Sequence, residues 1–234
     1  MEQAAADNAG IAGTGVTLLC FASGATDVLS YLTLGHVFTS AMTGCMALFC
    51  LTLINRKFAA ASRAGVSLLS YAIGSAAATL LQPRDPAKVR TLPVVRRLLL
   101  AETVSLAAYC TVSLLVDHPL AGAARYGLIV FSATAMGIQA VAARDIHERG
   151  IITVVLNITI TSVVIALTRR LTNRGLAHLP AHNRLQGIVI LGYVAGALAS
   201  AGAFVSGFAS PGLLPLVAVL LTLIMFTISG VQHA

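Results

Sequence analysis

Charged side chains are scarce in this sequence, and tryptophan is absent. Of the 234 residues, 10% are Asp, Glu, Lys or Arg, 57% are hydrophobic, and the mean hydropathy is +0.89. A soluble domain usually has about a quarter of its residues charged. So low a charged fraction excludes an ordinary soluble domain. The sequence therefore predicts an all-α fold, a polytopic bundle of transmembrane helices embedded in a lipid bilayer.

The common motifs of catalysis and metal binding are also missing. The four cysteines form no CxxC pair and lie inside apolar segments, and the sequence contains no HExxH and no GxSxG. Buried cysteines of this kind behave as small hydrophobic residues. We therefore expect a protein that is not an enzyme and that holds neither a metal nor a cofactor.

A net charge of +7 would suggest nucleic acid in a soluble protein. Here the basic residues gather in short loops at 56–63, 84–97 and 169–174, and they form no basic helix face. Lys and Arg beside membrane spans fix topology and meet anionic lipid headgroups. The lipid bilayer is therefore the expected partner, and nucleic acid is not.

Apolar residues gather in eight segments. They cover residues 14–34, 37–55, 63–82, 94–116, 124–143, 150–169, 186–208 and 211–230. Most approach the roughly 20 residues that cross a bilayer. Only Gly35-His36 separates the first two, and only Ser210-Pro211-Gly212 separates the last two. Either pair forms a helical hairpin or one partly re-entrant element, so about 7–8 segments with six, seven or eight crossings are expected in a single membrane domain, residues 1–234.

The positive-inside rule does not orient this chain. With eight strict crossings, Lys and Arg divide almost evenly between the two sides of the membrane. Such a tie leaves the orientation of the protein open. It would also result if one of the segments did not cross the membrane.

Two acidic residues lie well inside apolar segments. Asp27 lies in the first, and Glu102 lies in the fourth. A charged residue at the centre of a bilayer costs about 2.5–3.5 kcal/mol on insertion scales, so such residues face a cavity or a partner. Asp27 therefore marks either a substrate or proton path or a structural hydrogen bond to a neighbouring helix. For Glu102 the functional and the packing interpretations are equally open.

Polar residues also recur on helix faces. Thr39 and Thr43 share one face, and Asn157 lies in a second stripe with Thr153 and Thr161. At equal fractional depth along their spans, Asp27, Thr43 and Asn157 fall in one layer. We expect these three side chains to line a cavity near the midplane, with Glu102 at its edge.

The two stripes also hint at an internal repeat. Gly24 aligns with Gly137, and Thr43 aligns with Asn157, which suggests repeat halves of about 14–82 and 124–208. Repeats with a binding site at their interface are common in transporters. Helix breaks near Gly24 and Gly44 would add free backbone groups to such a site.

Small residues recur every four positions in two segments. The two patterns are Gly192, Gly196, Ser200 and Ser70, Gly74, Ala78. Such patterns let membrane helices approach closely, either within one chain or across a homo-oligomer.

The first segment carries a more specific pattern. It consists of Gly24-x-x-Asp27, then Phe38, then Met42-Thr43-Gly44, and it is joined by Glu102 and by Gly137-x-Gln139 in the fifth segment. In these residues the chain resembles the YoaK-like family. That resemblance implies a bacterial inner-membrane (cytoplasmic-membrane), multi-pass protein of a kind often labelled a permease. It also brings Gln139 into the substrate-binding set of Asp27, Thr39, Thr43, Glu102 and Asn157.

Two classes of function follow from these features. The first is a transporter or permease for an unidentified small molecule or ion, with a polar site at the midplane. The second is a non-transporting membrane scaffold or partner-binding protein. An intramembrane enzyme would need a nucleophile paired with a base, and the sequence shows no such pair.

Overall fold

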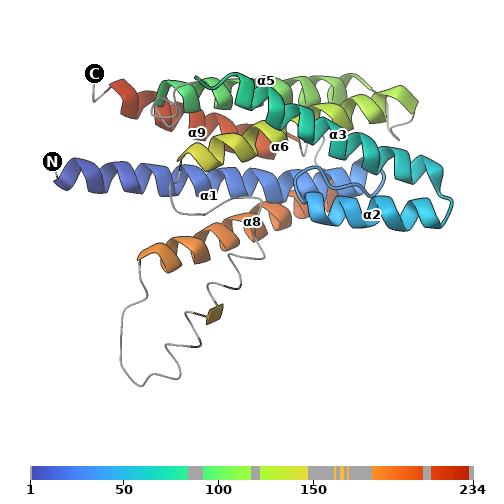
Figure 1. The fold of residues 1–234 in the computed structure, drawn as a ribbon, viewed down its shortest axis with the longest axis horizontal. Helices are drawn as coiled ribbons and strands as arrows, with labels where there is room; N and C mark the ends of the chain where they lie inside the picture. Colours follow the sequence, from blue (N-terminus) through green and yellow to red (C-terminus); the bar gives the residue numbers. More distant parts are fainter. Residues whose placement is uncertain are drawn as a thin grey trace.

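The computed structural model describes residues 2–83, 92–116, 122–146, 181–207 and 212–231, with Thr161, Val164, Ile165 and Thr168. These residues form seven long helices and no strand (Figure 1). The helices are α1 (Glu2–Thr33), α2 (Met42–Ile54), α3 (Phe58–Leu80), α5 (Leu92–Leu115), α6 (Gly122–Ile146), α8 (Ala181–Val205) and α9 (Leu213–Val231). The all-α helix bundle is confirmed. The expected segment at 150–169 lies almost wholly outside the described residues.

Fewer helices are long and apolar enough to cross a membrane than we expected. By length and composition four qualify within the described residues: Gly10–Thr33, Leu92–Leu115, Gly122–Ile146 and Leu185–Val205. Met42–Ile54 and Leu213–Ile228 are shorter apolar helices. Helix α3 is long, but serines such as Ser67 and Ser70 lower its hydropathy, and both are buried. Its polarity therefore belongs to a helix contact.

Hydrogen bonds show that α6 runs antiparallel to α1. Gln139, late in α6, donates to the carbonyl oxygen of Leu19 at 2.7 Å. Ser132, earlier in α6, lies 3.4 Å from the hydroxyl of Ser30, later in α1. The order of contacts is reversed, so the two helices point in opposite directions.

Helix α3, in contrast, runs parallel to α6. Near their first residues, the hydroxyls of Ser62 and Tyr126 lie 2.6 Å apart. Beyond the last turn of α3, Gln82 donates to Asp145 at 2.5 Å. Because α6 opposes α1, α3 must also oppose α1.

Helix α2 packs against α3 in the antiparallel sense. Only residues 55–57 separate the end of α2 from the start of α3, and the thiol of Cys45 donates to the carbonyl oxygen of Ala64 at 3.6 Å. In Figure 1 α2 continues in the direction of α1, and α3 returns past both. The chain therefore folds back on itself between α1 and α2 instead of making a hairpin of two full crossings.

The remaining helices complete the bundle around α1 and α6. Helix α8 runs parallel to α1, with Leu185 beside Gly13 and Tyr193 beside Gly24. Helix α9 runs antiparallel to α1, since its late residue Phe226 meets Gly15. Helix α5 packs against both α6 and α9.

Two helix crossings depend on reciprocal glycine pairs. A Cβ atom added to Gly24 would overlap the carbonyl oxygen of Tyr193, and one added to Gly196 would overlap that of Phe21. In each case the oxygen belongs to the residue three positions before the partner glycine. The α1–α8 backbones therefore touch, as small residues at membrane helix contacts allow.

The same geometry recurs between α3 and α6. A Cβ at Gly74 would overlap the carbonyl oxygen of Thr134, and one at Gly137 would overlap that of Tyr71. Both small-residue patterns in the sequence thus contribute glycines to contacts within one chain.

We expect Gly196→Ala to destabilise the protein by about 1–3 kcal/mol, because the added methyl group must push two backbones apart. Gly202→Ala on the same helix is the matched control, since nothing lies within 4 Å of a Cβ there. Alanine favours a helix over glycine, so the control should be neutral or slightly stabilising. Thermal unfolding of the purified variants tests this, and equal stability of the two would contradict the close crossing.

Candidate functional site

The break in the membrane helices lies after α1 and not at Gly24. Helix α1 continues through Gly24 to Thr33, so our expectation of a helix break at Gly24 is wrong. This glycine is needed for the contact with α8. The chain reverses at Gly35 and His36, whose φ angles are 87° and 62°, and α2 begins only at Met42, two residues before Gly44. The break therefore adjoins Gly44.

Asp27 binds the start of α2. One carboxylate oxygen accepts the backbone N–H groups of Thr39 at 3.2 Å, Ser40 at 2.8 Å and Ala41 at 3.2 Å. The other oxygen accepts the phenol of Tyr193 on α8 at 3.0 Å. Asp27 is 1% exposed. The carboxylate thus joins α1, the re-entrant chain and α8.

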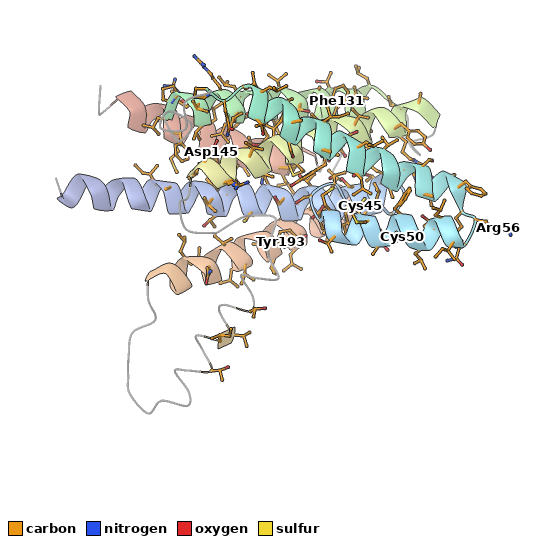
Figure 2. The ribbon with its side chains drawn as sticks, viewed as in Figure 1. Cys45, Cys50, Arg56, Phe131, Asp145 and Tyr193 are labelled. Carbon is orange, nitrogen blue, oxygen red and sulfur yellow. The ribbon has the colours of Figure 1, made fainter. Side chains whose placement is uncertain are left out.

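This contact satisfies a helix end that has no cap of its own. The N-cap residue of α2 is Ala41, which makes no side-chain hydrogen bond. The first N–H groups of a helix lack partners within it, and they carry a partial positive charge. Asp27 accepts the N–H of the N-cap residue Ala41 and of the two residues before it, and it supplies the complementary charge. Figure 2 shows Cys45 and Cys50 along α2 and Arg56 just beyond its end, all further from Tyr193 in this order.

Asp27 lies near the middle of the apolar layer. Arg125 and Arg144 lie near the two ends of the apolar part of α6, and Ser132 and Gln139 lie between them. These two residues contact Ser30 and Ser23 of α1, one on either side of Asp27. The start of α2 therefore lies deep inside the bundle.

A cluster of buried hydroxyl groups adjoins the break. Thr39 lies 3.0 Å from Ser30 and 2.9 Å from Ser132, which places α1, the re-entrant chain and α6 in contact. The side chain of Thr39 is fully buried. Thr39 thus meets Asp27 through its backbone and α6 through its hydroxyl, as part of one polar layer.

Gln139 belongs to the same interface between α1 and α6. Its amide nitrogen donates to the Leu19 carbonyl at 2.7 Å and to the Ser23 hydroxyl at 2.8 Å. Its carbonyl oxygen is buried and has no hydrogen-bond partner among the described residues. Gln139 therefore keeps one unused acceptor in the polar layer.

The other expected site residues do not join this cluster. Glu102 is fully buried on α5 and shares no hydrogen-bond partner with Asp27. Thr43 is exposed on α2. Asn157 lies outside the described residues. The described part of the chain contains no group of three or more His, Cys, Asp or Glu residues that could hold a metal ion.

Sequence reasoning missed Tyr193, Ser30 and Ser132. Tyr193 lies three residues before Gly196, so the small-residue pattern of α8 already marked the turn from which its phenol reaches Asp27. The two serines carried no comparable signal, since serine often bonds to its own helix.

With this geometry described, comparison with known proteins identifies the family. The chain matches the family described as "Protein of unknown function (DUF1275)" over residues 15–227. This protein belongs to that family. It is also 29% identical over 156 residues to the UPF0700 transmembrane protein YoaK of Bacillus subtilis (strain 168), which covers 67% of each chain. The expected YoaK-like membership is thus confirmed, and the protein is a membrane protein. No solved structure shows a significant match.

We expect Asp27→Ala to destabilise the protein by roughly 2–4 kcal/mol, because the change removes a helix cap and leaves buried N–H groups unsatisfied. Asp27→Asn keeps an acceptor oxygen and should lose only about 1 kcal/mol, the scale of a charge at a helix end. Tyr193→Phe should lose roughly 1–3 kcal/mol with its single hydrogen bond to the carboxylate.

Thermal unfolding in detergent measures this series. Thr14→Val is the control on the same helix, because Thr14 is exposed and bonds only to its own helix at Gly10. An Asp27→Ala variant as stable as the control would show that the carboxylate does not hold α2.

Proposed function

We propose that this protein is a transporter or permease for a small molecule or ion in the bacterial cytoplasmic membrane. Its binding site is the polar layer around Asp27. The observation that carries the proposal is the position of the backbone just before α2, where residues 39–41 donate to a buried carboxylate inside the bundle. The family name of the relative, a transmembrane protein, agrees with the location.

Irregular backbone at membrane depth is costly, so a break in a membrane helix suggests a functional site. Peptide groups outside a helix must find partners, because the hydrocarbon core offers none. Such breaks are tolerated where they are buried in protein or line a water-filled path, and discontinuous helices form the substrate sites of many transporters. The hydroxyls of Ser30, Thr39 and Ser132 and the free acceptor of Gln139 give this break further groups for a polar substrate.

An inverted repeat supports the same function. The contacts keep their pattern when α1 is exchanged with α6, α3 with α8, and α5 with α9. The glycine crossing of α1 with α8 then maps onto that of α6 with α3. Helices α6 and α8 run opposite to their counterparts α1 and α3. Cys110, late in α5, donates to Gly212, just before α9, as expected if α5 and α9 also run in opposite directions. We infer two repeats of opposite direction that extend the halves at 14–82 and 124–208, and transporters often bind substrate between such repeats.

The re-entrant path of α2 also predicts how the protein is oriented in the membrane. If α2 returns to the side it came from, α3 ends and α5 begins on the N-terminal side of α1. That side collects Arg96, Arg97, Arg144 and Arg184, and the sequence between α3 and α5 adds Arg84, Lys88 and Arg90 by chain order alone. The opposite side collects Arg56, Lys57, Arg63 and Arg125. The positive-inside rule then assigns the N-terminal side to the cytoplasm.

Other classes of function have less support. Neither an enzyme nor a nucleic-acid-binding protein is proposed, because among the described residues no nucleophile–base pair or basic helix face accompanies Asp27. A scaffold remains the alternative, since the hydrogen bonds of Asp27 also hold the fold together. A homo-oligomer would need a surface other than the glycine crossings, which are occupied within the chain.

A ligand-stabilisation screen on the purified protein tests the proposal. Ions, amino acids, sugars, organic acids and nucleobases are added to the wild type, to Asp27→Asn and to the control Thr14→Val. We expect at least one compound to stabilise the wild type and the control, by about 2.7 kcal/mol at one hundred times its Kd. Asp27→Asn should lose this effect. If no compound shows dependence on Asp27, the scaffold alternative replaces transport.

A further inference from the structure

Glu102 is a buried acid without a partner. Its side chain is 0% exposed, and neither carboxyl oxygen has a hydrogen-bond partner among the described residues. Buried polar groups in proteins nearly always have partners, so each exception needs an explanation. The hydrogen-bonding network around Asp27 does not explain the unpaired carboxyl group of Glu102, because that network does not include α5.

The surroundings of Glu102 are apolar. Leu98, Leu99 and Leu106 share its face of α5 at helical spacing, and all three are buried in a core cluster with Ala135 of α6 and Val219 of α9. The hydroxyls of two close neighbours on α5 are already used as donors to backbone carbonyls. Thr103 donates to Leu99, and Ser105 donates to Phe131 of α6.

Other ionisable groups lie away from this site. Helix α9 has none between Leu213 and Val231. Helix α6 has ionisable residues only near its ends: Arg125, Tyr126, Arg144 and Asp145. Helix α5 itself adds Arg96 and Arg97 near its start, and it adds Tyr109 and Cys110 about two turns after Glu102. No described basic residue pairs with Glu102.

A single carboxyl group in such a site can hold only a very small cation. Calcium takes six to eight oxygen ligands and magnesium takes six, whereas this site offers two oxygens from one residue. A proton needs one oxygen and no further ligand. An ionised carboxylate without a partner is also far more costly to bury than a neutral acid.

We propose that Glu102 is the proton-binding residue of the transport cycle. It is a neutral acid in the packed arrangement of α5, α6 and α9. When these helices separate, the O–H bond breaks, the carboxylate remains on Glu102 and the proton passes to water. The inference rests on the proposed transport function and names its coupling ion.

The location of Glu102 fits coupling to the polar layer. Ser105, one turn after Glu102, donates to the carbonyl oxygen of Phe131 at 2.9 Å. The next residue, Ser132, bonds to Thr39 at the start of α2. One turn of α6 therefore contacts both the helix of the acid and the re-entrant chain, and movement of α6 would affect both.

Infrared spectroscopy of the purified protein in lipid nanodiscs tests the proposal without substrate. A protonated carboxyl group has its own C=O stretching band, separate from that of a carboxylate. At neutral pH we expect the wild type to show such a band and Glu102→Gln to lose it. Asp27→Asn should retain it, which separates the two acids. Exchange into D2O should shift the band, because a proton carrier must reach water in some conformation.

Two results would overturn the proposal. A wild type without the band at neutral pH would mean that Glu102 is ionised and held by a cation. A band that stays unshifted in D2O would mean that the acid is sealed and structural. Should Glu102→Gln fail to insert, Glu102→Asp identifies the group by a displaced band. Because no substrate is added, these results are independent of the ligand screen at Asp27.

Discussion

The carboxylate of Asp27 against the start of α2 is the contact on which the rest of the arrangement depends. Just before α2 the hydrocarbon core would leave the backbone N–H groups of residues 39–41 without acceptors, and all three donate to one oxygen of Asp27. Without this acceptor these N–H groups would be buried and unsatisfied, which is costly. Asp27 thus has two roles, since the group that stabilises the break also makes it polar.

The glycine crossings hold the frame around this contact. Tyr193 reaches Asp27 because Gly24 and Gly196 let α1 and α8 touch. The equivalent crossing at Gly74 and Gly137 fixes α6, which presents Ser132 to the re-entrant chain. The close packing of the helices and the hydrogen bonds of the polar layer therefore depend on each other. A change that separates either pair of helices also removes a partner from the polar layer.

Much of this arrangement was predictable from the sequence, although some of it was not. Composition and segment length gave the helical membrane bundle, and the isolated carboxyl of Asp27 marked the right part of α1. The candidate set included Thr39, whose N–H donates to Asp27, but the depth argument placed Thr43 in the site, and a helix break was expected at Gly24. Periodicity reports which residues share a face, whereas the direction of a short helix and the partner of a glycine depend on contacts between distant segments.

Cysteine labelling tests the central claim, that α2 re-enters and returns to the same side. Single cysteines replace His36, Arg56 and Pro83 in a Cys50→Ala background, because Cys50 is the exposed native cysteine among those described. An impermeant maleimide is applied to intact cells and to inverted vesicles. The account predicts that positions 36 and 56 react from outside and position 83 from inside. Reaction of positions 36 and 56 from opposite sides would show that α2 crosses the membrane and would contradict the account.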